Sequence, residues 1–289
     1  MRERLGDLEG ALEEYEEASR LDPSLVLAQV KLSRLSADSG HSDEAIQRLR
    51  DTLEYNPQQV APRLLLASML KKSGQRRSAQ AELERVVQIE PEHWLAHSRL
   101  GHLHYNEKNY EAARDCFERA ARHAPDKPAV QFGLGLTLAA LGQHEGAIAA
   151  LGEANRLNPR QPSTITSMAN SLVALGRTEE ALRVLHEAMR RNRRSAVLHR
   201  KIGDIYVSLG RYAEAVEEYR ATVLNRRDGA EPDPELMAVL EGGGDPETVA
   251  KRAQQLMASG SRERRSQGSA DRPRRGRFQR GARMGRREA

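Results

Sequence analysis

Two helical runs meet at a glycine between Leu172 and Leu185, where the chain reads LVALGRTEEALRVL. Gly176 follows the first apolar run, where a left-handed residue can end a helix at no steric cost. The acidic pair after Thr178 suits the N-terminus of a second helix, and we expect Thr178 to cap that helix. The stretch therefore predicts a helix, a tight turn and a second helix.

This unit recurs along the chain with a period of 34 residues. Proline closes the unit because it has no backbone N–H and keeps the preceding residue out of the helical conformation. The closing prolines are Pro23, Pro57, Pro91, Pro125 and Pro159. At the turn, glycine is replaced once, by Lys108, and we expect the following Asn109 to tolerate the left-handed conformation there. A fixed spacing kept by several series of residues indicates a repeat array.

An alanine recurs without exception on the same period, and it marks the closest approach of the two helices in each unit. A larger side chain at such a contact would strain the pair by roughly 1–3 kcal/mol. The series is Ala11, Ala45, Ala79, Ala113, Ala147, Ala181 and Ala215. The first helices carry a matching column of small residues: Ser33, Ala67, Gly101, Gly135, Ala169 and Gly203. We expect large side chains of neighbouring helices to pack against these small positions.

The period and its Gly, Ala and Pro positions resemble those of the tetratricopeptide repeat (TPR) proteins. The resemblance extends from the first residue to about residue 227. It implies an all-α fold, a right-handed α-solenoid of stacked helix-turn-helix repeats. The predicted parts are a partial N-terminal repeat (1–25) and six repeats in 26–229, namely 26–59, 60–93, 94–127, 128–161, 162–195 and 196–229. Arginine replaces the closing proline at Arg193 and Arg227, which predicts straighter or frayed junctions there.

The region after the repeats is predicted to end the solenoid. A solenoid needs a cap over its last apolar face. We expect residues 230–258 to form a linker and a capping helix, which opens with Asp245 and Pro246 and ends near Met257. A separate partner-binding helix is the weaker alternative.

A basic tail follows, in residues 259–289, where 11 arginines face three acidic residues. The chain as a whole carries +5, so the basic balance belongs to this tail and the repeats are slightly acidic. The Arg/Gly-rich composition predicts disorder. We favour a solubilising extension over a weak contact with nucleic acid or another anionic surface, because Phe278 is the tail's one stacking group.

Candidate chemistry is sparse along the chain. The histidines around Trp94 are better explained by packing than by metal binding, because a metal site needs three or four convergent ligands. Cys116 reads as a small packing residue. No nucleophile motif or phosphate-binding loop stands in the sequence. We therefore predict no catalytic residue, metal or cofactor, and no enzymatic activity of this chain by itself.

The TPR resemblance implies that the first helices line a concave groove. The inward positions of the family then correspond to Leu64, Ser68, Lys71, Leu95, Ser98, Arg99, His102, Tyr105, Asn106, Phe132, Leu136, Thr166, Asn170, Arg200 and Asp204. This mixture of apolar and hydrogen-bonding groups suits an extended peptide or a helix of a partner protein. Some TPR domains hold acidic chain ends with a set of Lys, Asn and Arg; here Asn170 alone matches in type, so we predict no such clamp.

The preferred function is a protein–protein interaction scaffold or adaptor, and family resemblance suggests a bacterial multiprotein assembly as its setting. One alternative is a nucleic-acid-associated adaptor that uses the Arg-rich tail, and another is the regulatory TPR part of a larger transferase. No run of apolar residues is long enough to span a membrane. We expect a cytoplasmic location, or a periplasmic or membrane-attached one if the native chain extends N-terminally.

Overall fold

The computed structural model describes residues 8–22, 25–225 and 233–267. These residues form fifteen α-helices and no strand, which confirms the all-α prediction. The first helices of the repeats are α2 (Val26–Asp38), α4 (Val60–Lys72), α6 (Trp94–Asn106), α8 (Pro128–Ala140), α10 (Pro162–Ala174) and α12 (Ala196–Ser208). The second helices are α3 (Ser42–Tyr55), α5 (Arg76–Ile89), α7 (Tyr110–His123), α9 (His144–Leu157), α11 (Thr178–Arg191) and α13 (Tyr212–Leu224). Helix α1 (Leu8–Leu21) precedes them, and α14 (Pro234–Glu241) and α15 (Pro246–Gln267) follow.

The chain divides into two compact units, with the boundary along the sequence between Asn192 and Arg193. The first unit holds α1–α11 and the second holds α12–α15. The boundary coincides with the first repeat junction at which arginine stands in place of the closing proline. The predicted sixth repeat (196–229) therefore lies in a different unit from the first five.

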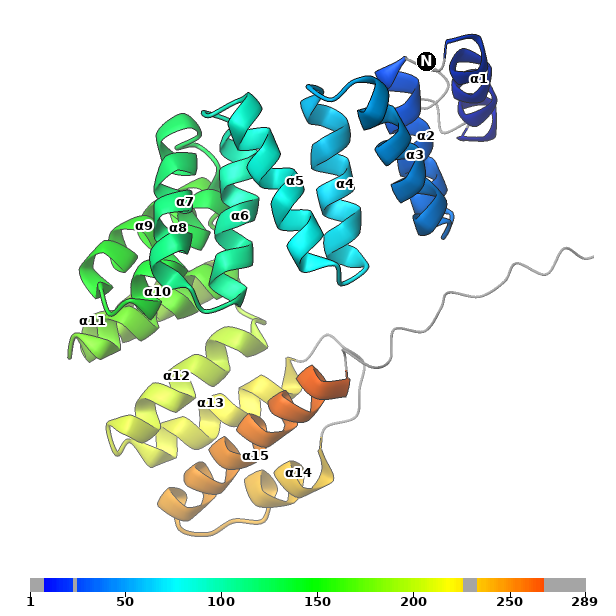
Figure 1. Cartoon of the computed structure of the whole chain (residues 1–289). Helices are drawn as coiled ribbons and strands as arrows, with labels where there is room; N and C mark the ends of the chain where they lie inside the picture. Colours follow the sequence, from blue (N-terminus) through cyan, green and yellow to red (C-terminus); the bar gives the residue numbers. More distant parts are fainter. Residues whose placement is uncertain (1–7, 23–24, 226–232, 268–289) are drawn as a thin grey trace, which may run out of the picture. The chain divides into compact units, whose positions relative to one another are not determined.

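Within the first unit the helices stack as the TPR resemblance implies (Figure 1). The two helices of each repeat pack on each other, as in α6 with α7 and α8 with α9. Each second helix from α3 to α9 also contacts the first helix of the next repeat, and first helices such as α2 and α4 touch directly. The alanine of the 34-residue series is fully buried in every repeat whose side chains are described, from Ala45 to Ala181 in this unit. Full burial of these alanines agrees with tight packing at the positions that the sequence indicated.

The turns inside the repeats use a left-handed residue, as predicted, but two details of the prediction were wrong. Lys108 itself has a φ of 62°, and Asn109 instead caps α7, its Oδ1 accepting a hydrogen bond from the Ala112 N–H at 3.3 Å. Thr178 is the first residue of α11 and Arg177 occupies the cap, without a capping hydrogen bond from its side chain. The left-handed residue is followed by a single residue before the next helix, so the cap falls one position earlier than the threonine.

Large side chains fill the space that the small residues leave. The ring of Phe117 in α7 lies against both Gly101 of α6 and Gly133 of α8, where an added Cβ would come within 2.9 Å and 2.4 Å of ring atoms. Leu151 contacts Gly135 in the same manner. The side chain of Phe117 is itself fully buried. This confirms the predicted packing of large side chains against the small column.

In the second unit, α15 packs on α13, α12 and α14 and covers the last repeat. Ala250, Ala253 and Met257 are buried in this contact, which agrees with a capping helix. The predicted end near Met257 was wrong, because α15 continues to Gln267. Residues 259–267 therefore belong to a helix and not to the predicted disordered tail, in keeping with the strong helix formers Arg and Glu at 262–265. The remaining tail, 268–289, lies outside the described residues.

No helix in the described part of the chain is both long and apolar enough to cross a membrane.

Candidate partner-binding groove

The predicted groove residues lie on the first helices of the repeats. Lys71, Asn106 and Asn170 are exposed, whereas Ser98 is buried, with 5% of its surface accessible. The others are half-buried: Leu64, Ser68, Leu95, Arg99, His102, Tyr105, Phe132, Leu136, Thr166, Arg200 and Asp204. Phe132 and Leu136, the large apolar members of this set on α8, are partly covered. Arg200 and Asp204 belong to the second unit, on α12.

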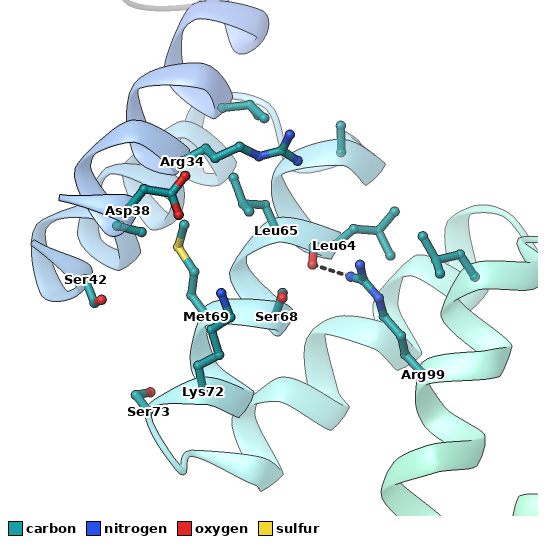
Figure 2. A pocket seen from close by; sticks show the side chains of 14 residues that line it. Arg34, Asp38, Ser42, Leu64, Leu65, Ser68, Met69, Lys72, Ser73 and Arg99 are labelled. Atoms are coloured by element: carbon teal, nitrogen blue, oxygen red, sulfur yellow. Dashed lines mark hydrogen bonds between the residues drawn. The ribbon is translucent and has the colours of Figure 1, made fainter. Parts of the chain in front are cut away.

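One cavity of about 580 Å³ brings four of the predicted residues together. It lies between α2, α4 and α6, and its lining includes Leu64, Ser68, Leu95 and Arg99 (Figure 2). A cavity of this size falls within the range of protein sites for small ligands or a few side chains. Three successive first helices therefore form one hollow.

The lining also contains residues that the sequence prediction missed. Val30 and Arg34 of α2 stand one 34-residue period before Leu64 and Ser68, so the repeat register could have identified them. Lys72 lines the cavity, whereas the predicted Lys71 does not. The choice between two adjacent lysines depends on how α4 is rotated about its axis, which sequence spacing gives only approximately.

Arg99 is held in place by a hydrogen bond to the neighbouring repeat. Its Nη1 donates to the carbonyl oxygen of Leu64 on α4, 2.7 Å away. The side chain is half-buried, and desolvation lowers the pKa of Arg99 from its ordinary value. A guanidinium stays charged even so. Among the described residues no carboxylate forms an ion pair with it, so a partly desolvated positive charge faces the cavity.

Further along α6, predicted groove residues pack on their own chain. The His102 ring meets the Phe117 ring edge-on, with 4.9 Å between centroids, and Tyr105 meets Tyr110 likewise at 5.4 Å. Burial lowers the pKa of His102, and the charge of Lys71 lowers it further. Burial also raises the pKa of Tyr105. Both side chains are thus neutral at pH 7.

In the second unit Asp204 is engaged by its own chain. It accepts a hydrogen bond from the Tyr219 hydroxyl at 2.9 Å and one from Nε2 of Gln254 on α15 at 3.3 Å. Burial, followed by the Asp204 charge, raises the pKa of Tyr219 and keeps this hydroxyl protonated. The capping helix therefore meets a position that the sequence had assigned to a partner.

Residues 58–267 match the family model described as the Cilia and flagella-associated protein 70 C-terminal domain, a TPR domain, over well more than half of the chain. The chain belongs to this TPR family. No curated protein sequence matches it.

Several solved TPR structures are similar to this TPR chain in fold. A tetratricopeptide repeat protein from Parabacteroides merdae has a TM-score of 0.56 at 16% identity, covering 86% of this chain and 94% of that one. YrrB, whose structure is described as a TPR protein with an unusual peptide-binding site, has a TM-score of 0.54 at 19% identity, with coverages of 72% and 97%. MamA from Desulfovibrio magneticus has a TM-score of 0.53 at 22% identity, with coverages of 57% and 96%. At these identities the likeness establishes the TPR fold alone.

The remaining candidates for chemistry in this TPR chain serve packing. His97 is 3% exposed, and its Nε2 lies 2.7 Å from the carbonyl oxygen of Pro91, so the ring ties α6 to the turn before it. Burial lowers the pKa of His97 and raises that of the Cys116 thiol, which disfavours the reactive thiolate. In the residues that the structure describes, no three potential ligands gather as a metal site would require.

Proposed function

We propose that this chain is a non-catalytic scaffold that binds a segment of a partner protein on the first helices of its N-terminal unit. The cavity between α2, α4 and α6 carries the proposal, because it joins predicted groove positions from successive repeats in one hollow. An extended peptide or a helix laid along these helices would contact several repeats at once.

The setting that we propose is a bacterial multiprotein assembly. Similar TPR structures come from bacteria such as Parabacteroides merdae and Desulfovibrio magneticus, and YrrB is described as having a peptide-binding site. In a chain built from stacked repeats each repeat contacts only its neighbours, and the stack presents an extended surface for binding. Such a surface suits a scaffold that binds partner proteins without catalysing a reaction.

The test is to compare the partners of the parent chain with those of a variant whose cavity is filled. Ser68→Trp places a large ring in the hollow, and Arg85→Gln on the exposed side of α5 is the matched control. Proteins that co-purify with the full-length parent from its native cells should be retained by Arg85→Gln and lost from Ser68→Trp. Identical sets from all three, with unchanged circular dichroism, would show that the cavity does not bind the partner.

A further inference from the structure

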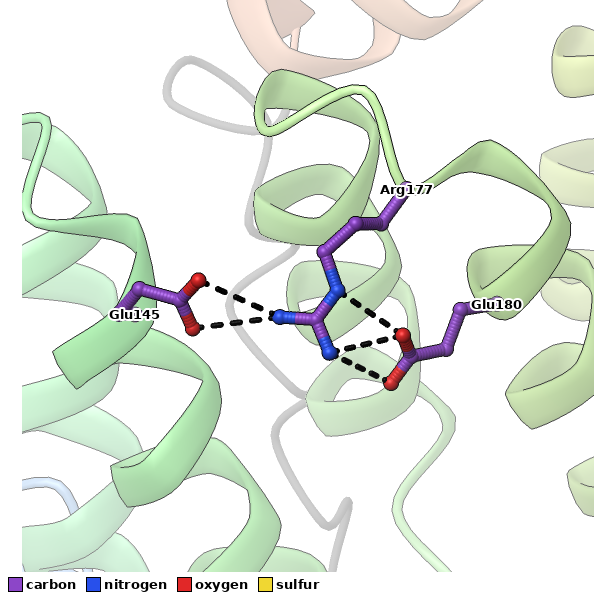
Figure 3. A network of polar contacts seen from close by, with 3 residues as sticks. All are labelled: Glu145, Arg177 and Glu180. Atoms are coloured by element: carbon purple, nitrogen blue, oxygen red, sulfur yellow. Dashed lines mark hydrogen bonds and ion pairs between the residues drawn. The ribbon is translucent and has the colours of Figure 1, made fainter.

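Two half-buried arginines of the first unit, Arg63 and Arg114, form ion pairs with carboxylates of their own chain. Arg63 of α4 pairs with Glu82 of α5 at 2.6 Å, and both side chains are largely covered. On the surface, Arg177 lies between two carboxylates, Glu145 of α9 and Glu180 of α11 (Figure 3). In each of these pairs a guanidinium is neutralised by a neighbouring carboxylate.

Arg99 differs from these arginines. It is half-buried, and its guanidinium donates a hydrogen bond to a neutral carbonyl group, that of Leu64. That bond uses Nη1 and leaves other guanidinium N–H groups for a further acceptor. Removing a cation from water without an anion is unfavourable, whereas a carboxylate that binds both terminal nitrogens makes a strong pair. The position of Arg99 is therefore prepared for an acceptor that the described residues do not supply.

Two of the three other charged side chains around the cavity are cations, like Arg99. In Figure 2, Arg34 reaches in from α2 and Arg99 from α6, while Leu64 and Leu65 of α4 lie between them. Lys72 adds a third cation, and Asp38 is the one carboxylate in the lining. Arg34, Lys72 and Asp38 are exposed at the rim. The balance of charge attracts an anionic group to this hollow.

Apart from Ser42, Ser68 and Ser73, the uncharged lining is aliphatic or the thioether of Met69. Val30, Leu64, Leu65, Met69 and Leu95 contribute apolar surface beside the cations. No aromatic ring belongs to the lining, so it has no platform on which a nucleic-acid base could stack. Aliphatic side chains of a peptide would fill this surface better than bases would.

We propose that this cavity binds an acidic side chain flanked by aliphatic ones, in a segment of a partner protein, and that Arg99 is the group that holds the carboxylate. The inference rests on the proposed function and specifies the chemistry of the partner. Leu64 orients the guanidinium through its carbonyl oxygen, the aliphatic lining takes the neighbouring side chains, and Arg34 and Lys72 attract the acidic segment from solution.

The experiment is a selection of random peptides displayed on phage, made on the immobilised full-length chain and on its Arg99→Gln variant. Glutamine removes the charge and keeps an N–H donor. Peptides selected by the parent chain should be enriched in Asp or Glu next to Leu, Ile or Val, and Arg99→Gln should lose the acidic enrichment. Enrichment of uncharged or basic peptides, or the same acidic enrichment with Arg99→Gln, would overturn this inference and leave the scaffold function standing. If the parent chain enriches no peptide at all, both proposals fail.

The affinity of one selected peptide for the parent chain and its variants then tests whether Arg99 contacts the acidic side chain of the peptide. Binding should weaken at least about tenfold with Arg99→Gln, and by a similar factor when the peptide's acid becomes its amide. The two changes together should cost less than the product of the separate factors, since they remove one shared interaction. Arg85→Gln, on the exposed side of α5, should leave the affinity unchanged. Independent, multiplying effects would contradict a direct contact.

Two further measurements address a variant that fails to fold and a competing class of ligand. If Arg99→Gln loses its helical circular dichroism, Arg34→Glu at the exposed rim takes its place, and it should also weaken binding severalfold. A single-stranded RNA oligonucleotide serves as the competing class of ligand. Displacement of the peptide by this RNA, with loss of RNA affinity in the same variant, would assign the site to nucleic acid and refute the peptide proposal.

Discussion

The ring of Phe117 rests against the backbone of Gly133, where a Cβ would lie 2.4 Å from the ring carbon Cε1. Phe117 is fully buried, and its ring also lies against Gly101 of α6. Gly133→Ala should therefore lower the free energy of unfolding by about 1–3 kcal/mol, although alanine favours helices. Gly152, also inside a helix, has no atom within 4 Å of an added Cβ, so Gly152→Ala is the matched control and should stabilise by about 0.5–1 kcal/mol. Urea unfolding followed by circular dichroism measures both, and a Gly133→Ala chain more stable than its parent would contradict the contact.

The left-handed backbone at Lys108 supplies a second prediction. Its φ of 62° is unfavourable for any residue with a Cβ, by about 1–2 kcal/mol relative to glycine. Lys108→Gly should therefore raise the thermal midpoint. The reverse change, Gly74→Ala, meets no neighbouring atom within 4 Å but forces a Cβ onto a φ of +84°, and should lower the midpoint. Opposite shifts in the two variants would support the turn geometry, while a lower midpoint for Lys108→Gly would count against it.

The alanine series predicts that a larger side chain destabilises the protein at position 147 but is tolerated at position 149 of the same helix. Ala147 of α9 is fully buried, and Ala147→Leu should destabilise the first unit by about 1–3 kcal/mol or more. Ala149 on the same helix is exposed, and Ala149→Leu should change the stability by less than about 0.5 kcal/mol. Equal melting temperatures for the two variants would show that the helices do not meet at Ala147.

Acid should weaken the first unit through His102. Burial, and then the charge of Lys71, lowers the pKa of His102 below its ordinary value of 6.5. The unfolded chain therefore binds more protons just below that pH, and this histidine's share of the stability is complete above pH 6.5 and is lost as the pH falls toward the folded pKa. His102→Gln should reduce the drop in melting temperature between about pH 7.5 and about pH 5. Lys71→Gln should reduce it less, because desolvation is the larger cause; a drop unchanged by His102→Gln would refute the assignment.

The positions of the helices could be predicted because each depends on signals a few residues away. The first helices begin at Val60, Trp94 and Pro128, where the repeat register placed them, because glycine, proline and alanine act on the backbone beside them. One prediction that failed concerns two adjacent residues, either of which could take the left-handed conformation at a turn. Lys108 and not Asn109 is left-handed, since Asn109 was better used as a cap. The end of α15 was missed because the last large apolar residue of the helix is Met257, and the helix continues through mostly polar residues to Gln267.

The candidate site could be predicted less completely. The register gave Leu64, Ser68, Leu95 and Arg99, but their meeting in one cavity with Arg34 and Lys72 depends on the rotation and spacing of three helices. The hydrogen bond from Gln254 to Asp204, fifty positions earlier, could not be predicted, because it depends on the packing of α15 on α12.

A 34-residue rhythm of small, large and turn-forming residues was thus enough to establish the helices, their order and their packing faces, because those follow from local backbone preferences and burial. The hollow and the unneutralised Arg99 emerged only when α2, α4 and α6 were assembled, since the environment of a charge depends on groups from all the helices around it.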